Sequence, residues 1–163
     1  MVVGVALFVL DRFKCVVRND FDIYSNINFE FIFVDMHHPN FGKKTVDAIY
    51  RPPDSNLDNI LIGFESVLFK LNCSKIDCVI AVDYNIDLMR HGSHAGTENY
   101  LHILYAHGII PTITKPTRFG KNTFTLIDNL LINKPSNAFI SGLLLTDISN
   151  HLPIFYIANS ITN

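Results

Sequence analysis

Short apolar stretches recur along the chain, and several alternate with polar residues as strands with one buried face do. The clearest case places Phe29, Phe31 and Phe33 on one face of an extended segment. The expected strand of residues 45–50 ends before Pro52 and Pro53, because proline has no N–H to donate to a ladder. Strands are expected over residues 2–9, 14–17, 29–33, 45–50, 76–82, 109–113, 123–132, 138–145 and 152–157.

Two other segments space their apolar residues three and four positions apart, as one face of a helix requires. The first follows Ser55, an N-cap candidate with Asp58 three residues later. Its apolar stripe consists of Leu57, Ile60, Leu61, Phe64, Val67, Leu68 and Leu71. The second is expected to begin at Thr97 and to end at Gly108, where a left-handed cap belongs. Two helices among many strands predict an α/β fold layered around one large sheet.

The composition is that of one globular domain. The 163 residues are 48% hydrophobic and 17% charged, which supports a buried core and argues against disorder. The formal net charge of −2 gives no global basic field, although a local basic groove for nucleic acid is compatible with it.

The three cysteines, Cys15, Cys73 and Cys78, form no CxxC motif. Neither a disulfide framework nor a zinc site is therefore expected, and the thiols indicate a reducing compartment.

The apolar N-terminus is not expected to be a secretion signal. No Lys or Arg precedes the apolar run of residues 1–10, and Asp11 and Arg12 follow it at once. No apolar run approaches the length of a membrane span. These features predict an intracellular protein, nuclear or cytoplasmic.

Two polar residues, Asp83 and Asn85, follow the apolar run of residues 76–81. Side chains alternate along an extended chain, so both should point the same way while Tyr84 points back. An apolar strand that ends in two polar groups on one side indicates a site at its C-terminal end. An Asx-rich turn is the alternative reading of the same stretch.

A further acid, Asp128, lies within an apolar segment near the C-terminus. Burial of a carboxylate is unfavourable unless the group is paired, and a histidine is a natural partner. His151, at the start of the last expected strand, is the candidate. The two residues could belong to a site or form a buried structural contact.

These motifs, taken in order, resemble a known family. They read Gly4-Val5-Ala6-Leu7-Phe8-Val9, Tyr50-Arg51-Pro52-Pro53, Asp83-Tyr84-Asn85-Ile86-Asp87-Leu88, Lys115-Pro116-Thr117-Arg118, Thr125-Leu126-Ile127-Asp128-Asn129 and Ser149-Asn150-His151-Leu152-Pro153-Ile154. Together they resemble the endonuclease/exonuclease/phosphatase superfamily, and within it the endonuclease domain of non-LTR (LINE-type) retrotransposons. The resemblance implies a DNase I-like four-layer α/β sandwich, incomplete at the N-terminus. Residues 1–163 would be its middle and C-terminal portion.

The resemblance also implies catalytic roles. Family members cleave phosphodiesters with a divalent cation, usually Mg²⁺, with Mn²⁺ as an alternative. Asp83 would bind the metal or activate the attacking water, and Asn85 would fix that water or a phosphate oxygen. His151 would contact the scissile phosphate and stabilise its developing charge, while Asp128 sets the tautomer of the imidazole. Tyr50 would lie against the phosphate or the leaving group.

The same resemblance implies a DNA partner. Thr117, Arg118 and Arg51 would contact the DNA backbone, where such residues position a duplex without reading its sequence. A reverse transcriptase domain would accompany this one in a full-length element.

Three departures from the family pattern predict reduced activity. The family's metal-binding Glu has no counterpart, because Glu30 lies downstream of its position and Glu65 and Glu98 lie on expected helices. Asn150 stands where the family usually has Asp, so it is at most a weak metal ligand. Val82 stands where the family usually has Gly, and its branched side chain should crowd the site.

Three functions remain open from the sequence. The first is a metal-dependent DNA-nicking endonuclease fragment of reduced activity. The second is a non-catalytic remnant that binds DNA or protein weakly. The third is a phosphatase or lipid phosphodiesterase on the same fold.

Overall fold

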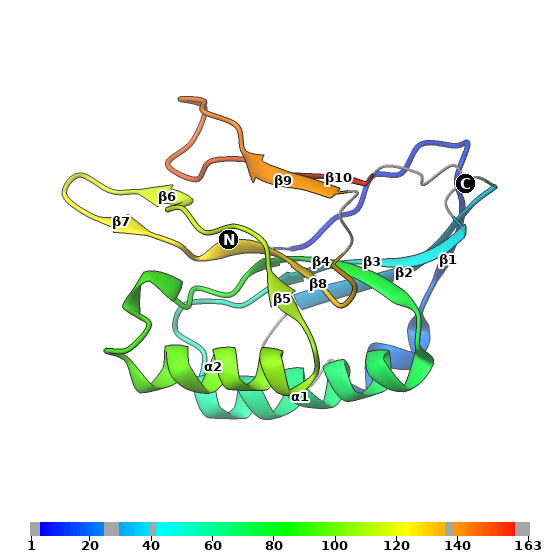
Figure 1. Cartoon of the computed structure of the whole chain (residues 1–163), viewed down its shortest axis with the longest axis horizontal. Coiled ribbons are helices and arrows are strands. Elements are labelled where there is room, and N and C mark those ends of the chain that lie inside the picture. The colour runs from blue at the N-terminus through cyan, green and yellow to red at the C-terminus, as the bar shows by residue number, and fades with distance from the viewer. Residues whose placement is uncertain (1–3, 25–29, 40–41, 136–138, 159–163) are drawn as a thin grey trace.

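A six-stranded mixed sheet forms the centre of the computed structural model, which describes residues 4–24, 30–39, 42–135 and 139–158 (Figure 1). The order across the sheet is β1-β2-β3-β4-β8-β5. The strands are β1 (Lys14–Val17), β2 (Glu30–His38), β3 (Gly42–Tyr50), β4 (Asp77–Asp83), β8 (Asp128–Ile132) and β5 (Ile110–Pro111). The expected α/β fold class is confirmed.

Only the β3–β4 pair is parallel among the pairings of this sheet; the others are antiparallel. Parallel neighbours need a crossover, and the helix α1 (Leu57–Ser74) supplies it. Because β3 and β4 run the same way, they end at the same edge of the sheet, with Tyr50 opposite Asp83. This edge carries the residues discussed below.

Both helices, α1 and α2 (Ala95–Ala106), cover one face of the sheet (Figure 1). The apolar stripe of α1 faces the sheet as expected, and Phe64 and Leu68 are almost fully buried. The ring of Phe64 lies 4.8 Å from that of Tyr84, which in turn lies 5.1 Å from that of Tyr100 on α2. The main core therefore lies between the sheet and the helices.

The helix starts differ from those expected. The N-cap of α1 is Asn56, whose side chain accepts a hydrogen bond from the N–H of Asn59 at 3.0 Å, while Ser55 donates to the carbonyl of Pro52. The N-cap of α2 is His94, three residues before Thr97, and its Nδ1 accepts from the N–H of Thr97 at 3.2 Å. Asn is as good an N-cap as Ser, so the sequence could not separate the candidates.

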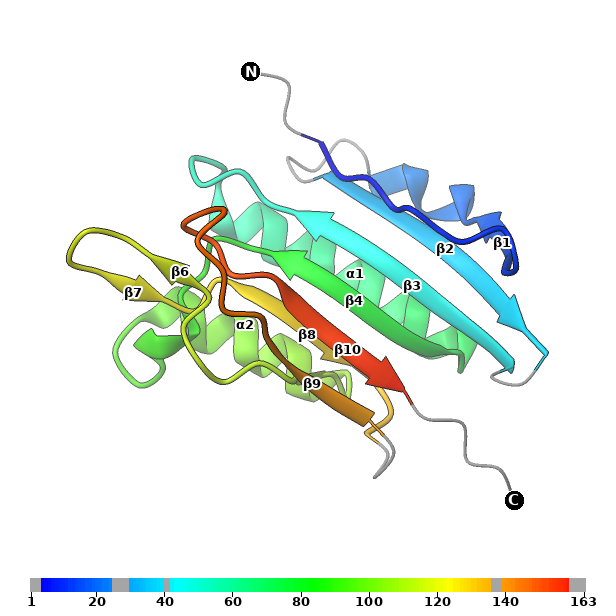
Figure 2. The ribbon, with the colours of Figure 1, turned by 90° about the horizontal axis from the view of Figure 1, so that it is seen from above.

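A smaller second layer lies across the opposite face of the sheet (Figure 2). It consists of β9 (Phe139–Leu143) paired antiparallel with β10 (Ile154–Ala158). A second apolar cluster of Ile113, Leu126 and Leu130 packs between this layer and the sheet. The described residues thus form three layers of the expected four-layer sandwich.

The remaining elements are short. The hairpin of β6 (Arg118–Phe119) and β7 (Phe124–Thr125) extends from the sheet edge, and η1 (Asn19–Tyr24) and η2 (Leu88–Arg90) are 3₁₀ turns. No helix within the described ranges combines the length and apolar character needed to cross a bilayer.

Several expected strands are longer than those observed; β5, for example, covers only Ile110–Pro111 of the expected 109–113. Two others are wrong in larger part. The segment 123–132 is interrupted, because the N–H of Leu126 donates to the Asp87 side chain and that of Ile127 to the Thr117 hydroxyl instead of to a neighbouring strand. Residues 4–10 belong to no ladder within the described residues. Val2, Val3, Phe29 and Ala138, expected in strands, lie outside the described residues.

Candidate active site

Three candidate residues lie side by side where adjacent strands meet the same edge of the sheet. The register pairs Tyr50 of β3 with Asp83 of β4, and Asp83 with Asp128 of β8. All three are half-buried. They line a depression of about 360 Å³ together with Leu152, which follows His151. Sequence positions far apart are therefore brought to one surface by strand pairing alone.

His151 joins this row through Asp128. Its Nδ1 lies 3.1 Å from Oδ2 and 3.2 Å from Oδ1 of Asp128. The backbone holds the residue in place, because His151 forms a bridge with Arg118 and the N–H of Phe119 donates to the carbonyl of Asn150 at 2.8 Å. With Nδ1 engaged by the carboxylate, Nε2 is the ring nitrogen available to a ligand.

Asp83 completes the cluster. Ligand atoms of Asp83, Asp128 and His151 all lie within 4.8 Å of one another. Burial, followed by the charge of Asp128, raises the pKa of Asp83 above its ordinary value, although His151 and Arg118 act in the opposite direction. The site therefore holds two nearby carboxylates, one of which is destabilised in its charged form.

The donor set fits a divalent cation. Oxygen ligands suit Mg²⁺ and Mn²⁺, and the carboxylate of Asp83 has no ion pair among the described residues. Asp128 already interacts with His151, so Asp83 is the principal ligand available. A cation beside it would offset the unfavourable effects of burial and of the Asp128 charge. Asn150 is exposed, and its Oδ1 lies 3.5 Å from the hydroxyl of Ser149.

Asn85 lies close to Asp83 but has a different contact. Its backbone adopts φ +51°, a left-handed conformation that Asn tolerates better than most residues, and its N–H donates to Asp83 Oδ1 at 3.3 Å. Its side-chain amide donates to the carbonyl of Arg51 at 2.8 Å. Asn85 therefore ties the end of β4 to the end of β3. Tyr84 points into the core, as expected.

Arg51 does not occupy the expected DNA-contacting position. It is buried, and its guanidinium donates to the carbonyls of Tyr84 and Ser55 at 3.0 Å, with longer contacts to those of Asn85 and Pro53. A guanidinium has five N–H groups and can satisfy several carbonyls at once. Arg51 thus clamps the two loops that follow β3 and β4.

Thr117 is likewise structural. It is fully buried, and its hydroxyl accepts hydrogen bonds from the N–H groups of Ile127 at 3.3 Å and Asp128 at 3.1 Å. The side chain therefore holds the segment that presents Asp128 instead of contacting a phosphate. Its neighbour Arg118 is exposed and remains available to a ligand.

The expected crowding by Val82 is not observed. Along β4 the buried positions alternate with half-buried ones, and Val82 belongs to the core beneath the sheet. Asp83 points to the opposite face because successive side chains alternate. The side chain of Val82 is accommodated in that core, where it is buried.

Sequence reasoning gave Glu30 no role, yet the structure brings it to the same sheet edge. Glu30 starts β2 directly opposite Tyr50, in the row that continues to Asp83 and Asp128. Its Oε2 lies beside Gly4, 3.4 Å from where a Cβ would stand. Only the register reveals this position, since β2 and β4 are separated in sequence by β3 and α1. Glu30 lies outside the cluster of mutually close ligand atoms.

The backbone is similar to three solved structures of low sequence identity. The endonuclease domain of TRAS1, a telomere-specific non-LTR retrotransposon, superposes with a TM-score of 0.69 at 14% identity, covering 94% of this chain and 71% of that one. An endonuclease/exonuclease/phosphatase family protein from Bacteroides thetaiotaomicron gives 0.53 at 11% identity, with coverages of 76% and 52%. Beta toxin from Staphylococcus aureus with bound magnesium ions gives 0.55 at 10% identity, with coverages of 79% and 57%.

These similarities establish the fold. The chain has the endonuclease/exonuclease/phosphatase, DNase I-like fold, as the sequence motifs predicted. It spans between about half and about seven tenths of the length of the three structures. No family model matches the sequence, and no curated protein matches it either.

Proposed function

On this fold, we propose that residues 1–163 form the middle and C-terminal portion of a metal-dependent phosphodiester hydrolase domain that nicks DNA, with reduced activity. The observation that carries the proposal is the convergence of Asp83, Asp128 and His151, whose ligand atoms lie within 4.8 Å of one another. An ion-binding carboxylate beside an oriented imidazole at strand ends is what phosphodiester cleavage requires.

Each residue has a distinct role in the proposed reaction. A bound Mg²⁺ or Mn²⁺ would polarise a phosphoryl oxygen and acidify a coordinated water. Asp83 would hold the cation and accept hydrogen bonds from the attacking water. His151 would direct Nε2 toward the phosphate, because Asp128 holds Nδ1. Tyr50, beside Asp83, would contact the phosphate or the leaving group.

The surface next to His151 favours DNA over a lipid or a small phosphate ester. Arg118 is exposed and forms a backbone bridge with His151. The rings of Phe119 and Phe124 are 40% and 59% exposed on the same hairpin, in edge-to-face contact at 5.4 Å. A cation beside exposed aromatic rings suits a phosphate backbone with adjacent bases. Cleavage of a lipid phosphodiester but not of DNA would reverse this choice.

A plasmid-nicking assay tests the proposal. The full chain, with Mg²⁺ or Mn²⁺, should convert supercoiled plasmid slowly to open circles. Asp83→Ala and His151→Ala should lower the rate by at least about 100-fold, the loss typical when one group that stabilises the transition state is removed. Asp147→Ala removes a carboxylate from the exposed loop before His151 and should leave the rate unchanged. Equal loss in all three variants would refute these assignments.

The non-catalytic alternative rests on Asn150. A neutral amide at this position, with Asp83 as the one carboxylate of the described cluster that has no ion pair, predicts weak cation binding. Changes around a metal typically reduce affinity about 10–100-fold. Asn150→Asp should therefore raise the nicking rate if the site is an impaired enzyme. Plasmid binding without nicking, in this variant as in the parent chain, would establish the non-catalytic reading instead.

A further inference from the structure

Asp87 lies on the loop that leaves β4, four residues after Asp83, and its contacts join three parts of the fold. Its Oδ1 accepts the N–H of Met89 at 3.1 Å, which caps η2, and the N–H of Leu126 at 2.9 Å. Its carbonyl accepts a hydrogen bond from the hydroxyl of Thr97, a fully buried residue of α2, at 3.2 Å. Asp87 therefore connects the loop after β4 both to the helix layer and to the chain before β8.

The hydrogen bond to Leu126 lies just beyond the end of the β4–β8 ladder. Asp83 and Asp128 form the last register pair of that ladder. Past this pair, the N–H of Leu88 donates to the carbonyl of Leu126 at 2.9 Å, beside the contact of Asp87 with the N–H of the same residue. The side chain of Asp87 thus continues the connection between the two strands that carry the carboxylates of the site.

Two side chains hold three consecutive N–H groups, those of residues 126–128. The first of these groups donates to Asp87, and the other two donate to the hydroxyl of Thr117. Asp128 in turn lies 3.1 Å from Nδ1 of His151. The direction of the imidazole therefore depends on the side chains that fix the backbone leading into Asp128.

We propose that Asp87 is a positioning residue of the candidate active site. It sets the separation of the two halves of the site, which are Asp83 on one side and Asp128 with His151 on the other. The inference rests on the proposed phosphodiester hydrolysis, in which a cation at Asp83 and the ring of His151 must reach the same phosphate. A displacement of about 1 Å in such an arrangement can lower the rate about 100-fold.

The positioning role needs an acceptor oxygen and no negative charge. A carboxamide oxygen at the same place can accept the same two N–H groups, although neutral hydrogen bonds are weaker than charged ones. Asp87→Ala should therefore lower kcat for plasmid nicking about 100-fold, with KM changed less than about threefold because Asp87 acts through Asp128. Asp87→Asn should stay within about fivefold of the parent.

The orientation of the imidazole can be measured without any reaction. When Asp128 accepts from Nδ1, the neutral ring of His151 carries its proton on that nitrogen, and ¹⁵N chemical shifts identify this tautomer. At about pH 9, where an ordinary imidazole is neutral, the parent and Asp87→Asn should show it, whereas Asp87→Ala should show both tautomers. Amide exchange at Leu126 should be at least about tenfold faster in Asp87→Ala.

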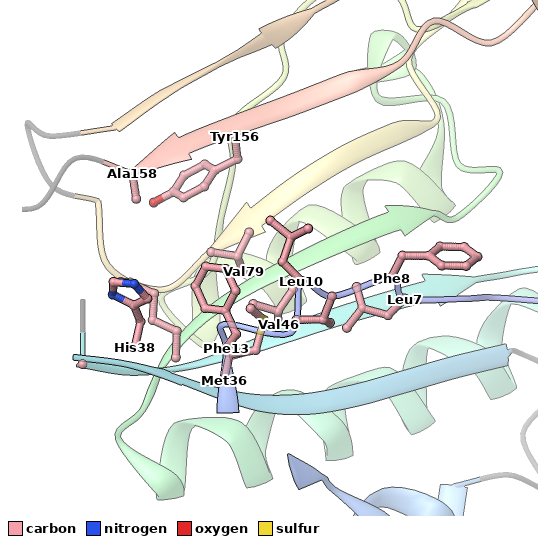
Figure 3. A pocket seen from close by; sticks show the side chains of 13 residues that line it. Leu7, Phe8, Leu10, Phe13, Met36, His38, Val46, Val79, Tyr156 and Ala158 are labelled. Carbon is pink, nitrogen blue, oxygen red and sulfur yellow. The ribbon is translucent and has the colours of Figure 1, made fainter. Parts of the chain in front are cut away.

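Two control variants weaken the fold elsewhere. Asn56→Ala removes the N-cap of α1, which accepts one N–H at 3.0 Å as Asp87 does for Leu126. Val46→Ala removes apolar contacts in a groove of about 500 Å³ on the open face of the sheet, four residues along β3 from Tyr50 (Figure 3). Both should lower Tm but leave kcat and the ring tautomer as in the parent.

The two measurements separate this inference from the proposed function. A single Nδ1–H tautomer in Asp87→Ala, or the same tautomer mixture in either control variant, would overturn the positioning role. Equal loss of kcat in Asp87→Asn and Asp87→Ala would overturn it as well, because it would mean that the charge of Asp87 is what matters. A parent chain that does not nick DNA would refute only the proposed function, since the ring tautomer would still decide whether Asp87 orients His151.

Discussion

Asp47 offers the sharpest test of how this fold is stabilised. It lies in the middle of β3 and is fully buried on the helix side of the sheet, and neither carboxyl oxygen has a hydrogen-bond partner among the residues that the structure describes. Burial, followed by the charge of Asp35, raises its pKa well above the ordinary value, with a smaller opposing effect of Arg18. Burial therefore disfavours the charged form of Asp47 in the folded chain, and the unpaired carboxyl group is expected to destabilise the fold.

Two substitutions separate the contributions of Asp47. Asp47→Val removes both the unpaired polar group and its titration, and should raise the free energy of unfolding by about 1–3 kcal/mol, the usual penalty of a buried unsatisfied group. In a domain of this size each kcal/mol raises Tm by about 2–4 °C. Asp47→Asn keeps a buried polar group but cannot ionise. Comparing it with the parent therefore isolates the part of the free energy of unfolding that depends on the titration of Asp47.

The sign of that pH dependence follows from proton linkage. As pH rises above the ordinary Asp pKa, the unfolded chain releases the proton of Asp47 while the folded chain retains it. The parent should therefore lose stability relative to Asp47→Asn as pH increases from about 4 upward, until the raised pKa is reached. Below that window the difference between the two proteins should be constant.

Urea denaturation followed by circular dichroism between pH 3 and pH 8 measures these differences. Asp35 titrates in the opposite sense: burial raises its pKa, but hydrogen bonds from Lys43 and Thr45 and the charge of Arg18 outweigh this and lower it. Comparing variants at each pH cancels that contribution, and exposed Asp54→Asn is the control. A destabilised Asp47→Val, or a parent-to-Asn difference that does not vary with pH, would refute the reasoning.

Three further predictions concern the residues around the site. Arg51→Ala should lower the free energy of unfolding by more than about 2 kcal/mol in urea titration, because it leaves several loop carbonyls without donors. A loss below about 0.5 kcal/mol would contradict the role of Arg51 in holding the two loops together. Thr117→Val should lower the free energy of unfolding by about 1–3 kcal/mol, whereas Thr117→Ser keeps the hydroxyl and should not lower it. Equal losses in the two variants would mean that the hydrogen bonds from the N–H groups of Ile127 and Asp128 do not stabilise the fold. Asp83→Asn should weaken Mn²⁺ binding, measured by electron paramagnetic resonance, at least about tenfold, and unchanged binding would place the cation elsewhere.

The sequence by itself determined the elements whose chemistry is local. The apolar stripe from Leu57 to Leu71 predicted α1, because only a helix places those positions on one face. The unfavourable burial of a lone carboxylate predicted a partner for Asp128, and His151 is that partner. The order of the motifs predicted the fold that the structural similarities confirm.

Only the tertiary structure decided what depends on a partner distant in sequence. Arg51 and Thr117 carry groups that could bind phosphate, and their roles changed because other segments of the chain meet those groups first. The parallel pairing of β3 with β4 sets the row of Tyr50, Asp83 and Asp128, and no periodicity encodes that register. A residue type limits which bonds a side chain can make, whereas strand pairing decides which partner it finds.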